Sequence, residues 1–417
     1  MKIITLFALA LAATFAQATQ FLMGSTDMNS YRCGQDIVFT FEVKGEETRK
    51  VQWERVGDDG IKENGTEEVA PGGTFTVKTA SGRPGFVHVN THILNADGKR
   101  VDSRQTRWFA SAAVEPEEIR GVDEPDDFDA FWNKQKQRLA DTPWRDGVKR
   151  EKVESANTRH DIYRLTIPAP GPQPATAHIL IPKNAGPDAK KGLSVSFHGY
   201  GWGGNGVPNP DWHGDGEIHI DVNAHGFELG REAEYYKDFE RAVTAKGMYG
   251  FVAEENANPE TTYFNGMILR GLRVLEYAKS LPEWNGKTLT VKGGSQGGFQ
   301  ALVLAGLDRD VTFCDANVPW ICDMGGKARL GRWGAWQPDF TDALNYYDPV
   351  HHASRIPATC KVYISRNGLG DTVCPPSGIC AVYNNINAPK AMRMVQGSEH
   401  GDWGAMPAGT QEWEVEN

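Results

Sequence analysis

Apolar and polar residues alternate one by one in several short runs along the N-terminal part of the chain. Between residues 19 and 113 the runs show the period of a half-buried β-strand, and turn-forming segments such as 57–60 and 95–98 separate them. Short strands at this spacing predict a small all-β domain over residues 19–113, similar to an immunoglobulin sandwich. Trp53 occupies an alternating position, which favours a core side chain over a sugar-binding one.

The pattern changes after a charged, proline-bearing junction at residues 114–118. An acidic turn precedes a helical run that ends near Arg138, and longer helical segments follow at 263–281 and 299–307. Runs of strand length lie at 163–167, 177–181, 193–197, 218–222, 288–291, 311–316, 361–364 and 391–395. Strands that alternate with helices predict an α/β domain over residues 114–417, built on a mostly parallel sheet.

The most informative segment lies between the strand-like run 288–291 and the helical run 299–307. It reads Gly-Gly-Ser-Gln-Gly-Gly, with the serine at position 295. The order of strand, Gly-x-Ser-x-Gly and helix is typical of the nucleophile elbow of α/β hydrolases, a turn so tight that side chains at the flanking glycines would clash. The segment predicts that Ser295 is a catalytic nucleophile. An inert serine in a glycine-rich turn is the alternative, and the flanking strand and helix disfavour it.

A serine hydroxyl needs a base to take its proton and a third group to orient that base. In α/β hydrolases the acid and then the histidine follow the nucleophile along the chain. Asp371 comes after the strand-like run 361–364, and His400 comes after the run 391–395. Both therefore lie in loops beyond the carboxyl ends of predicted strands, where parallel sheets form their sites. Ser295, Asp371 and His400 are the predicted catalytic triad.

The oxyanion of an acyl-transfer intermediate needs two N–H donors. We expect one from Gln296, directly after the nucleophile, and one from Tyr200, in the loop after the run 193–197. His198 in the same loop is expected to hold the loop in place rather than to titrate in catalysis. Three tryptophans follow or neighbour these loops and are candidates to stack on a sugar ring or to close an apolar acetyl pocket. They are Trp202, Trp212 and Trp320.

Several segments resemble the acetyl xylan esterase and cephalosporin C deacetylase family, carbohydrate esterase family seven. The similar segments are 126–132, 197–201, the elbow around Ser295, 315–323 and 371–376. The resemblance covers residues 123–403 and leaves the β domain outside. It implies an α/β-hydrolase fold, the triad and oxyanion donors named above, and the removal of acetyl groups from sugars through an acetyl-enzyme.

Two positions depart from the family pattern. Asn223-Ala224-His225 stands where the family has Arg-Gly-Gln, and Gly401 follows the histidine where the family has Glu. Both changes leave the triad intact, but they bear on the support of the site and on the range of substrates. The segment 326–338 is shorter than the interface region of the family, so the sequence leaves the oligomeric state open.

The charge and the N-terminus indicate where the protein works and on what. A formal net charge of −10 argues against nonspecific nucleic-acid or anionic-membrane binding and suits a neutral acetylated oligo- or polysaccharide. Residues 1–18 combine Lys2, an apolar run and an Ala-Gln-Ala cleavage site, which is typical of a secretory signal. We therefore expect a secreted or periplasmic protein with no membrane segment after cleavage.

No cofactor and no metal are expected. The six cysteines lack the Cys-x-x-Cys spacing of a zinc site, and the adjacent His351 and His352 have no obvious third ligand. In an exported protein some cysteines can pair, and the candidate pairs are Cys374 with Cys380 and Cys314 with Cys360. Two other functions stay open at this point: a broader carboxylesterase or peptidase on the same fold, and a glycan-binding protein with a degenerate hydrolase domain.

Overall fold

The structure is a computed structural model, which describes residues 22–26, 30–103, 105–400 and 412–416. The predicted signal sequence and Gly401 lie outside these residues. Among the described helices, none has both the length and the apolar character that a membrane span requires.

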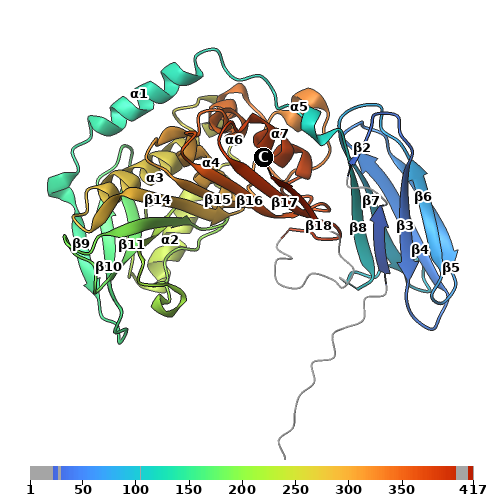
Figure 1. Cartoon of the computed structure of the whole chain (residues 1–417), viewed down its shortest axis with the longest axis horizontal. Coiled ribbons are helices and arrows are strands. Elements are labelled where there is room, and N and C mark those ends of the chain that lie inside the picture. Colours follow the sequence, from blue (N-terminus) through green and yellow to red (C-terminus); the bar gives the residue numbers. More distant parts are fainter. Residues whose placement is uncertain (1–21, 27–29, 104, 401–411, 417) are drawn as a thin grey trace, which may run out of the picture.

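The N-terminal part of the described chain is an all-β unit of two sheets (Figure 1). One sheet contains β1 (Leu22–Thr26), β3 (Ile37–Val43) and β6 (Thr74–Thr79). The other has the order β2 (Ser30–Tyr31), β8 (Arg107–Val114), β7 (Gly85–Leu94), β4 (Arg49–Gly57) and β5 (Glu63–Val69). Side chains from both sheets, such as Phe39 and Trp108, share one buried cluster, so the sheets pack face to face. Trp53 is half-buried and packs against this cluster, as expected for a core-facing position.

The rest of the described chain is built on a ten-stranded sheet. Its order is β18 (Glu412–Glu416), β17 (Lys390–Val395), β16 (Lys361–Gly368), β15 (Phe313–Asn317), β14 (Trp284–Gly294), β12 (Lys191–Phe197), β13 (Glu217–Asn223), β11 (Ala175–Pro182), β10 (His160–Ile167) and β9 (Lys149–Val153). The strands from β12 to β17 run parallel, whereas β11, β10, β9 and β18 pair antiparallel at the two sides. Each strand predicted in this part is present, and β9 and β18 were not predicted.

Helices accompany this sheet. They are α1 (Phe128–Ala140), α2 (Ala233–Val243), α3 (Tyr263–Lys279), α4 (Gln296–Leu307), α5 (Gly326–Leu330), α6 (Pro349–Ala353) and α7 (Pro376–Asn385), with short turns η1 (Pro116–Glu118), η2 (Arg145–Gly147), η3 (Pro210–Trp212), η4 (Glu255–Ala257) and η5 (Asp342–Tyr347). Helices α3, α4 and α7 contact the strands of the sheet. Helix α4 is apolar on all sides and is almost entirely buried between the sheet and its neighbours α3 and α6. It begins directly after Ser295 and so holds the predicted nucleophile against the core.

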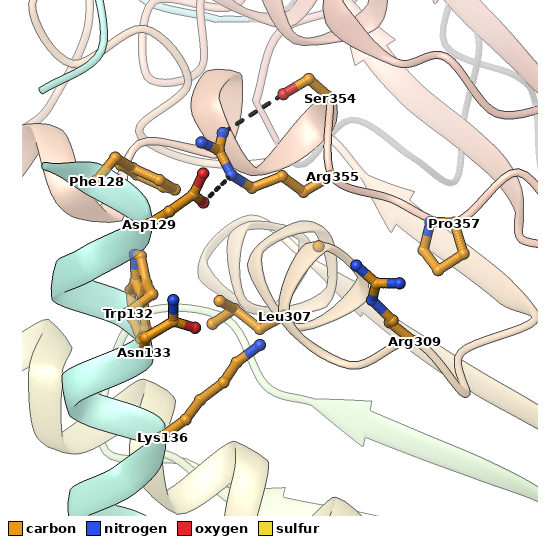
Figure 2. A pocket seen from close by; sticks show the side chains of 11 residues that line it. Phe128, Asp129, Trp132, Asn133, Lys136, Leu307, Arg309, Ser354, Arg355 and Pro357 are labelled. Carbon is orange, nitrogen blue, oxygen red and sulfur yellow. Dashed lines mark hydrogen bonds and ion pairs between the residues drawn. The ribbon is translucent and has the colours of Figure 1, made fainter. Parts of the chain in front are cut away.

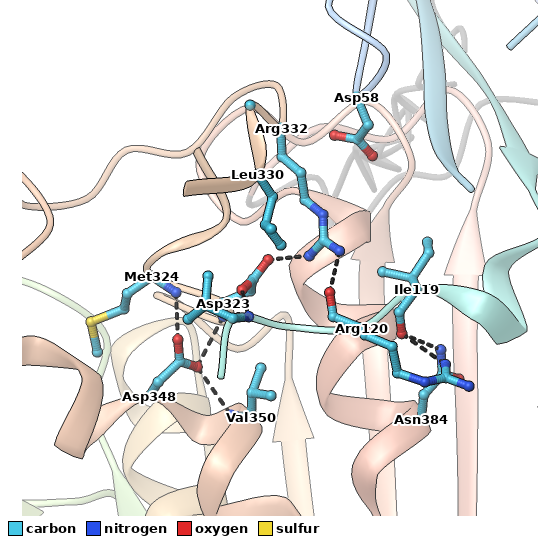
Figure 3. A network of polar contacts seen from close by, with 12 residues as sticks. Asp58, Ile119, Arg120, Asp323, Met324, Leu330, Arg332, Asp348, Val350 and Asn384 are labelled. Carbon is cyan, nitrogen blue, oxygen red and sulfur yellow. Dashed lines mark hydrogen bonds and ion pairs between the residues drawn. The ribbon is translucent and has the colours of Figure 1, made fainter. Parts of the chain in front are cut away.

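The segment after α5 connects the β unit to the α/β part (Figure 3). The guanidinium of Arg332 donates to the carboxylate of Asp323 and to the carbonyl of Arg120, just after the junction. The neighbouring Trp333 N–H donates to Oδ1 of Asp58, in the loop after β4, at 3.0 Å. Asp58 is buried, and that burial raises the pKa of its carboxyl. The two parts are thus joined by polar contacts, and the division between residues 113 and 114 stays a prediction.

Neither candidate cysteine pair is bonded, and all six cysteines are free thiols. Cys374 lies beside Ser295, whereas Cys380 lies in α7 near Asp58, so the two sulfur atoms have different surroundings. Cys314 and Cys360 are close enough to interact but are not bonded. Burial raises the pKa of each of these four thiols, so they stay protonated.

Candidate active site

Ser295 occupies a strained turn between β14 and α4. Its backbone has φ 55° and ψ −117°, a region that non-glycine residues rarely adopt, and its N–H donates to the carbonyl of Asn317 at 2.9 Å. A Cβ atom added at Gly293 would lie 2.6 Å from the carbonyl oxygen of Phe197, and one added at Gly297 would lie 2.1 Å from the same oxygen. The turn therefore has the tight geometry of a nucleophile elbow, as predicted from the glycine spacing.

Asp371 and His400 form a hydrogen-bonded pair. Nδ1 of His400 lies 2.8 Å from Oδ2 of Asp371, which is fully buried. The other oxygen, Oδ1, accepts the backbone N–H groups of Val373 at 2.7 Å and Cys374 at 2.8 Å. A carboxylate that accepts at Oδ2 requires the hydrogen on Nδ1. In a neutral imidazole the other ring nitrogen, Nε2, is then the atom that can take up a proton.

The topology explains why residues distant in sequence meet here. Ser295 follows β14, Asp371 follows β16 and His400 follows β17, and these strands run parallel. Their carboxyl ends therefore lie along one edge of the sheet, where α/β proteins form their sites.

Cys374 is a member of this site that the sequence analysis did not identify. Its Sγ atom and the facing atoms of Asp371 and His400 all lie within 4.8 Å of one another. Burial raises the pKa of the Cys374 thiol well above its usual range, and a hydrogen bond with Ser295 opposes that shift. Asp371 already accepts three hydrogen bonds, from the backbone N–H groups of Val373 and Cys374 and from the His400 ring.

The two segments predicted to supply the oxyanion donors are joined by Tyr249. Gln296 is fully buried at the first position of α4, and the Tyr249 hydroxyl donates to its Oε1 at 2.9 Å. The N–H of Gly201 donates to the same hydroxyl oxygen at 2.7 Å. The Tyr200 ring stacks on Tyr249 with centroids 4.1 Å apart. The role of Tyr249 could not be predicted from the sequence, because it depends on the contact between the loop after β12 and helix α4.

The residues that replace the family's Arg-Gly-Gln hold the loop after β12. Nε2 of His225 lies 2.9 Å from the carbonyl of Gly201, and its Nδ1 lies 2.7 Å from the hydroxyl of Tyr263. Burial lowers the pKa of His225 to about 3, so the ring is neutral near pH 7. The N–H of Ala224 donates to Nε2 of His198 at 3.1 Å, which supports the expectation that His198 is structural.

The three tryptophans have different positions. Trp320 is fully buried and its ring lies 5.3 Å from that of Tyr200, so it forms an apolar wall and is not available to stack on a sugar. Trp202 is half-buried and stacks on His225 at 4.3 Å.

Trp212 is not at the site, contrary to expectation. It is 84% exposed in η3, just before the amino end of β13, whereas Ser295 follows the carboxyl end of β14. Both strands run parallel to β12, so these ends lie on opposite edges of the sheet. The loop after β12 must cross the sheet to start a parallel strand, and it carries Trp212 away from the serine.

Trp336 is an aromatic residue of the site that the sequence analysis missed. It is 38% exposed, and its ring lies 4.8 Å from that of Tyr200 and 5.0 Å from that of Phe251. Its N–H donates to the carbonyl of Val373, two residues after Asp371, at 3.3 Å. Trp336 therefore gives the site a partly exposed aromatic surface, whereas Trp320 behind it is closed off.

A cavity of about 580 Å³ lies elsewhere, between α1 and the end of α4 (Figure 2). Lys136 and Arg309 are at its walls, and Arg355 beside them is paired with Asp129. Leu307 lines this cavity and is the last residue of α4, whereas Ser295 directly precedes the first residue of that helix. The length of α4, about 18 Å, therefore separates the cavity from Ser295. The cavity is not part of the serine site.

Comparisons with known proteins identify the family of the chain. The family model of the acetyl xylan esterases matches residues 117–332 and 337–415, which leaves out the β unit and the segment 333–336. Acetyl esterase Axe7A of Xylanibacter ruminicola is 31% identical over 333 residues, covering 76% of this chain and 71% of that protein.

Two solved structures share the fold. They are an acetyl xylan esterase from Paenibacillus sp. R4 and acetyl xylan esterase 1 from Thermoanaerobacterium sp. JW/SL YS485, each with a TM-score of 0.55 and 22% identity. Each covers 69% of this chain, and the matches span 93% and 92% of the two structures. The α/β part is thus an α/β-hydrolase fold. The family model and the 31% identical relative show that the chain belongs to the acetyl xylan esterase family and is a carboxylic-ester hydrolase.

Proposed function

We propose that this protein is a secreted serine esterase that removes acetyl groups from acetylated xylan or other acetylated sugars. The observation that carries the proposal is the 2.8 Å bond between His400 and buried Asp371, beside a serine in a strained elbow. The family match supports the acetyl ester as the bond that is cleaved. The signal-like residues 1–18 support export.

In the proposed mechanism His400 acts as base and then as acid. Nε2 takes the proton of Ser295 Oγ while that oxygen attacks the acetyl carbonyl, and the backbone N–H groups of Tyr200 and Gln296 stabilise the oxyanion. When the tetrahedral intermediate collapses, the C–O bond to the sugar breaks and His400 returns the proton to the sugar oxygen. Water then attacks the acetyl-enzyme with His400 again as base, and acetate leaves as Ser295 is protonated.

The surroundings of Ser295 suit a small acyl group and a neutral sugar. Trp320 and the stacked Tyr200 and Tyr249 place apolar rings next to the proposed oxyanion site. Trp336 offers a partly exposed ring at the same place, and an aromatic ring of this kind packs against the apolar face of a sugar. Trp336 therefore replaces Trp212 as the proposed sugar contact.

The test is acetate release from a panel of acetylated xylo-oligosaccharides. Ser295→Ala is expected to lower kcat by at least about 10⁴-fold, and Asp371→Asn by about 10⁴-fold because the histidine loses its orienting partner. Ser280→Ala, which removes a hydroxyl bonded only within the end of α3, is the matched control and is expected to keep full activity. Unchanged acetate release by Ser295→Ala would refute the proposal. Comparable turnover of acetyl and octanoyl esters would instead indicate a broader carboxylesterase.

A further inference from the structure

The β unit touches the two loops that carry the proposed acid and base. Strands β7 and β8 lie on the side of the β unit that faces the α/β part (Figure 1). The family model begins at residue 117, so these strands lie outside the residues that it matches. Strands β7 and β8 nevertheless contact residues that are close in sequence to Asp371 and His400.

The first contact is a reciprocal pair of hydrogen bonds between Ser111 and Gln396. The Ser111 N–H donates to Oε1 of Gln396 at 2.9 Å, and Nε2 of Gln396 donates to the Ser111 carbonyl at 2.7 Å. Both residues are buried, so water cannot replace either bond, and an unmade bond would be costly. Gln396 directly follows β17 and lies at the start of the loop that ends with His400.

The second contact reaches the loop of Asp371 from the same residue. Oγ of Ser111 donates to the carbonyl of Leu369 at 2.5 Å, and Leu369 is two residues before Asp371. Nδ1 of His88 lies 2.6 Å from that Oγ. Because the hydroxyl hydrogen is directed to Leu369, the His88 ring must donate from Nδ1, which fixes its tautomer. Ser111 thus contacts both loops and is itself held by a buried ring.

The third contact is an ion pair at the rim of the same loop. Nε and the Nη2 atom of Arg107 donate to the two carboxylate oxygens of Glu399 at 2.9 Å and 3.0 Å. This two-point geometry fixes the orientation of Glu399, which directly precedes His400. Arg107 and Ser111 belong to the same strand, β8, so their spacing is set by a regular element.

Close packing accompanies these bonds. A Cβ atom at Gly370, next to Asp371, would lie 2.6 Å from Cβ of Phe109, and one at Gly397 would lie 2.1 Å from the ring of Trp108. Only glycine allows β8 to approach both loops this closely.

We propose that the β unit positions the acid and the base of the site, with Ser111 and Arg107 as its positioning residues. The inference rests on the proposed roles of Asp371 and His400. One strand, β8, holds Leu369, Gln396 and Glu399 together, and so sets the position of His400 relative to Asp371 and Ser295. The β unit is in this sense part of the hydrolase and not an independent binding module.

The test compares Arg107→Ala, Arg107→Lys and Ser111→Ala with the full-length protein, using 4-nitrophenyl acetate. Arg107→Ala and Ser111→Ala are each expected to lower kcat by about 10- to 100-fold with KM within about twofold, because a misplaced base affects the chemical step rather than binding. Arg107→Lys is expected to recover part of the loss, since it keeps the charge but not the two-point bond. The matched control is Arg100→Ala, whose side chain bonds to Gln52 within the β unit, and it is expected to leave kcat unchanged.

Failure of this proposal can be distinguished from failure of the proposed esterase function. The Arg107 side chain is 24% exposed, so its loss leaves the buried core intact and the variant is expected to fold. If Arg107→Ala and Ser111→Ala are folded and keep their kcat, or lose only melting temperature, the proposal is wrong even though Ser295→Ala is inactive. If Arg107→Ala does not fold, Glu399→Gln decides the question by the same measurements.

Discussion

The hydroxyl of Tyr249 donates a 2.9 Å hydrogen bond to Oε1 of Gln296 while it accepts the N–H of Gly201 at 2.7 Å. One phenol oxygen therefore joins the loop after β12 to the first turn of α4. These are the two segments proposed to hold the oxyanion, so Tyr249 sets the distance between their donors.

Tyr249→Phe tests this link. The change keeps the ring that stacks on Tyr200 but leaves two groups without their partner, the Gly201 N–H and the buried Oε1 of Gln296. We expect kcat for 4-nitrophenyl acetate to fall about tenfold and the free energy of unfolding to fall by about 1–3 kcal/mol. Tyr236→Phe is the matched control, because its hydroxyl accepts the N–H of Arg231 at an exposed site. A variant that loses stability and keeps its kcat would show that Tyr249 has no part in catalysis.

Trp336→Ala separates sugar binding from chemistry. Loss of a partly exposed ring beside Tyr200 is expected to raise KM for an acetylated xylo-oligosaccharide by roughly 5- to 10-fold and to leave KM for 4-nitrophenyl acetate unchanged. Steady-state kinetics on both substrates measure the difference. Trp212→Ala removes a more exposed tryptophan on the opposite edge of the sheet and is expected to change neither value. An equal rise in KM for both substrates would show that Trp336 acts by holding Tyr200 in place and not by binding sugar.

Buried histidines predict that the protein loses stability in acid. Burial lowers the pKa of His88, His225 and His352 to about 3 and that of His178, His219 and His351 to about 4. Below pH 6.5 the unfolded chain binds protons that the native protein does not, so the free energy of unfolding falls from pH 6.5 toward pH 4. Burial raises the pKa of Asp348 to about 7 and also raises the pKa of Asp58, Glu276, Asp315 and Asp323. These carboxyls act in the opposite direction and reduce the net slope.

His352→Asn measures one part of this effect. His352 is fully buried, and each proton taken up only by the unfolded chain contributes a slope of about 1.4 kcal/mol per pH unit. Urea unfolding at pH 7, 6 and 5 measures how the free energy of unfolding depends on pH. The slope of this dependence is expected to be smaller in the variant by up to about 1.4 kcal/mol per pH unit. A free energy of unfolding that stays constant or rises as the pH falls would contradict the prediction.

The free thiols predict a simple labelling pattern. Cys33 is exposed and the other five cysteines are buried. Ellman's reagent is therefore expected to react with one thiol in the native protein and with six in urea without reductant. Labelling at Cys33 should speed up above neutral pH, since slight desolvation and a hydrogen bond to the Glu115 carboxylate raise its thiol pKa. Cys33→Ser is expected to abolish native labelling, and fewer than six reactive thiols in urea would reveal a disulfide.

The fold was predictable where apolar patterns are local. The central strands were found because burial on both faces makes them apolar throughout, as in β11, with all eight residues buried. Strands β9 and β18 were missed because they lie at the edges of the sheet and consist mainly of charged residues, as Lys149–Val153 does. These two segments are strands because their backbones pair with a neighbouring strand. Their mainly charged sequences do not by themselves indicate a strand.

The site was predictable where chemistry follows chain order. Ser295, Asp371 and His400 each follow a strand, and the order of hydrolase residues is enough to nominate them. Tyr249, Trp336 and Ser111 were not predictable, since each gains its role from a contact between distant segments. Ser111 and Gln396, for example, are 285 positions apart. Trp212 was wrongly placed at the site because the sequence does not show where the long loop after β12 crosses to the other edge of the sheet.

The close approach of β8 to Gly370 and Gly397 limits how this chain can vary. A related sequence with a larger residue at either glycine needs a smaller residue at the facing position, Phe109 or Trp108, to keep the same backbone path. The two parts are thus expected to evolve together across their contact. A chimera that pairs this hydrolase part with a foreign β unit has to preserve those side-chain volumes to keep an intact enzyme.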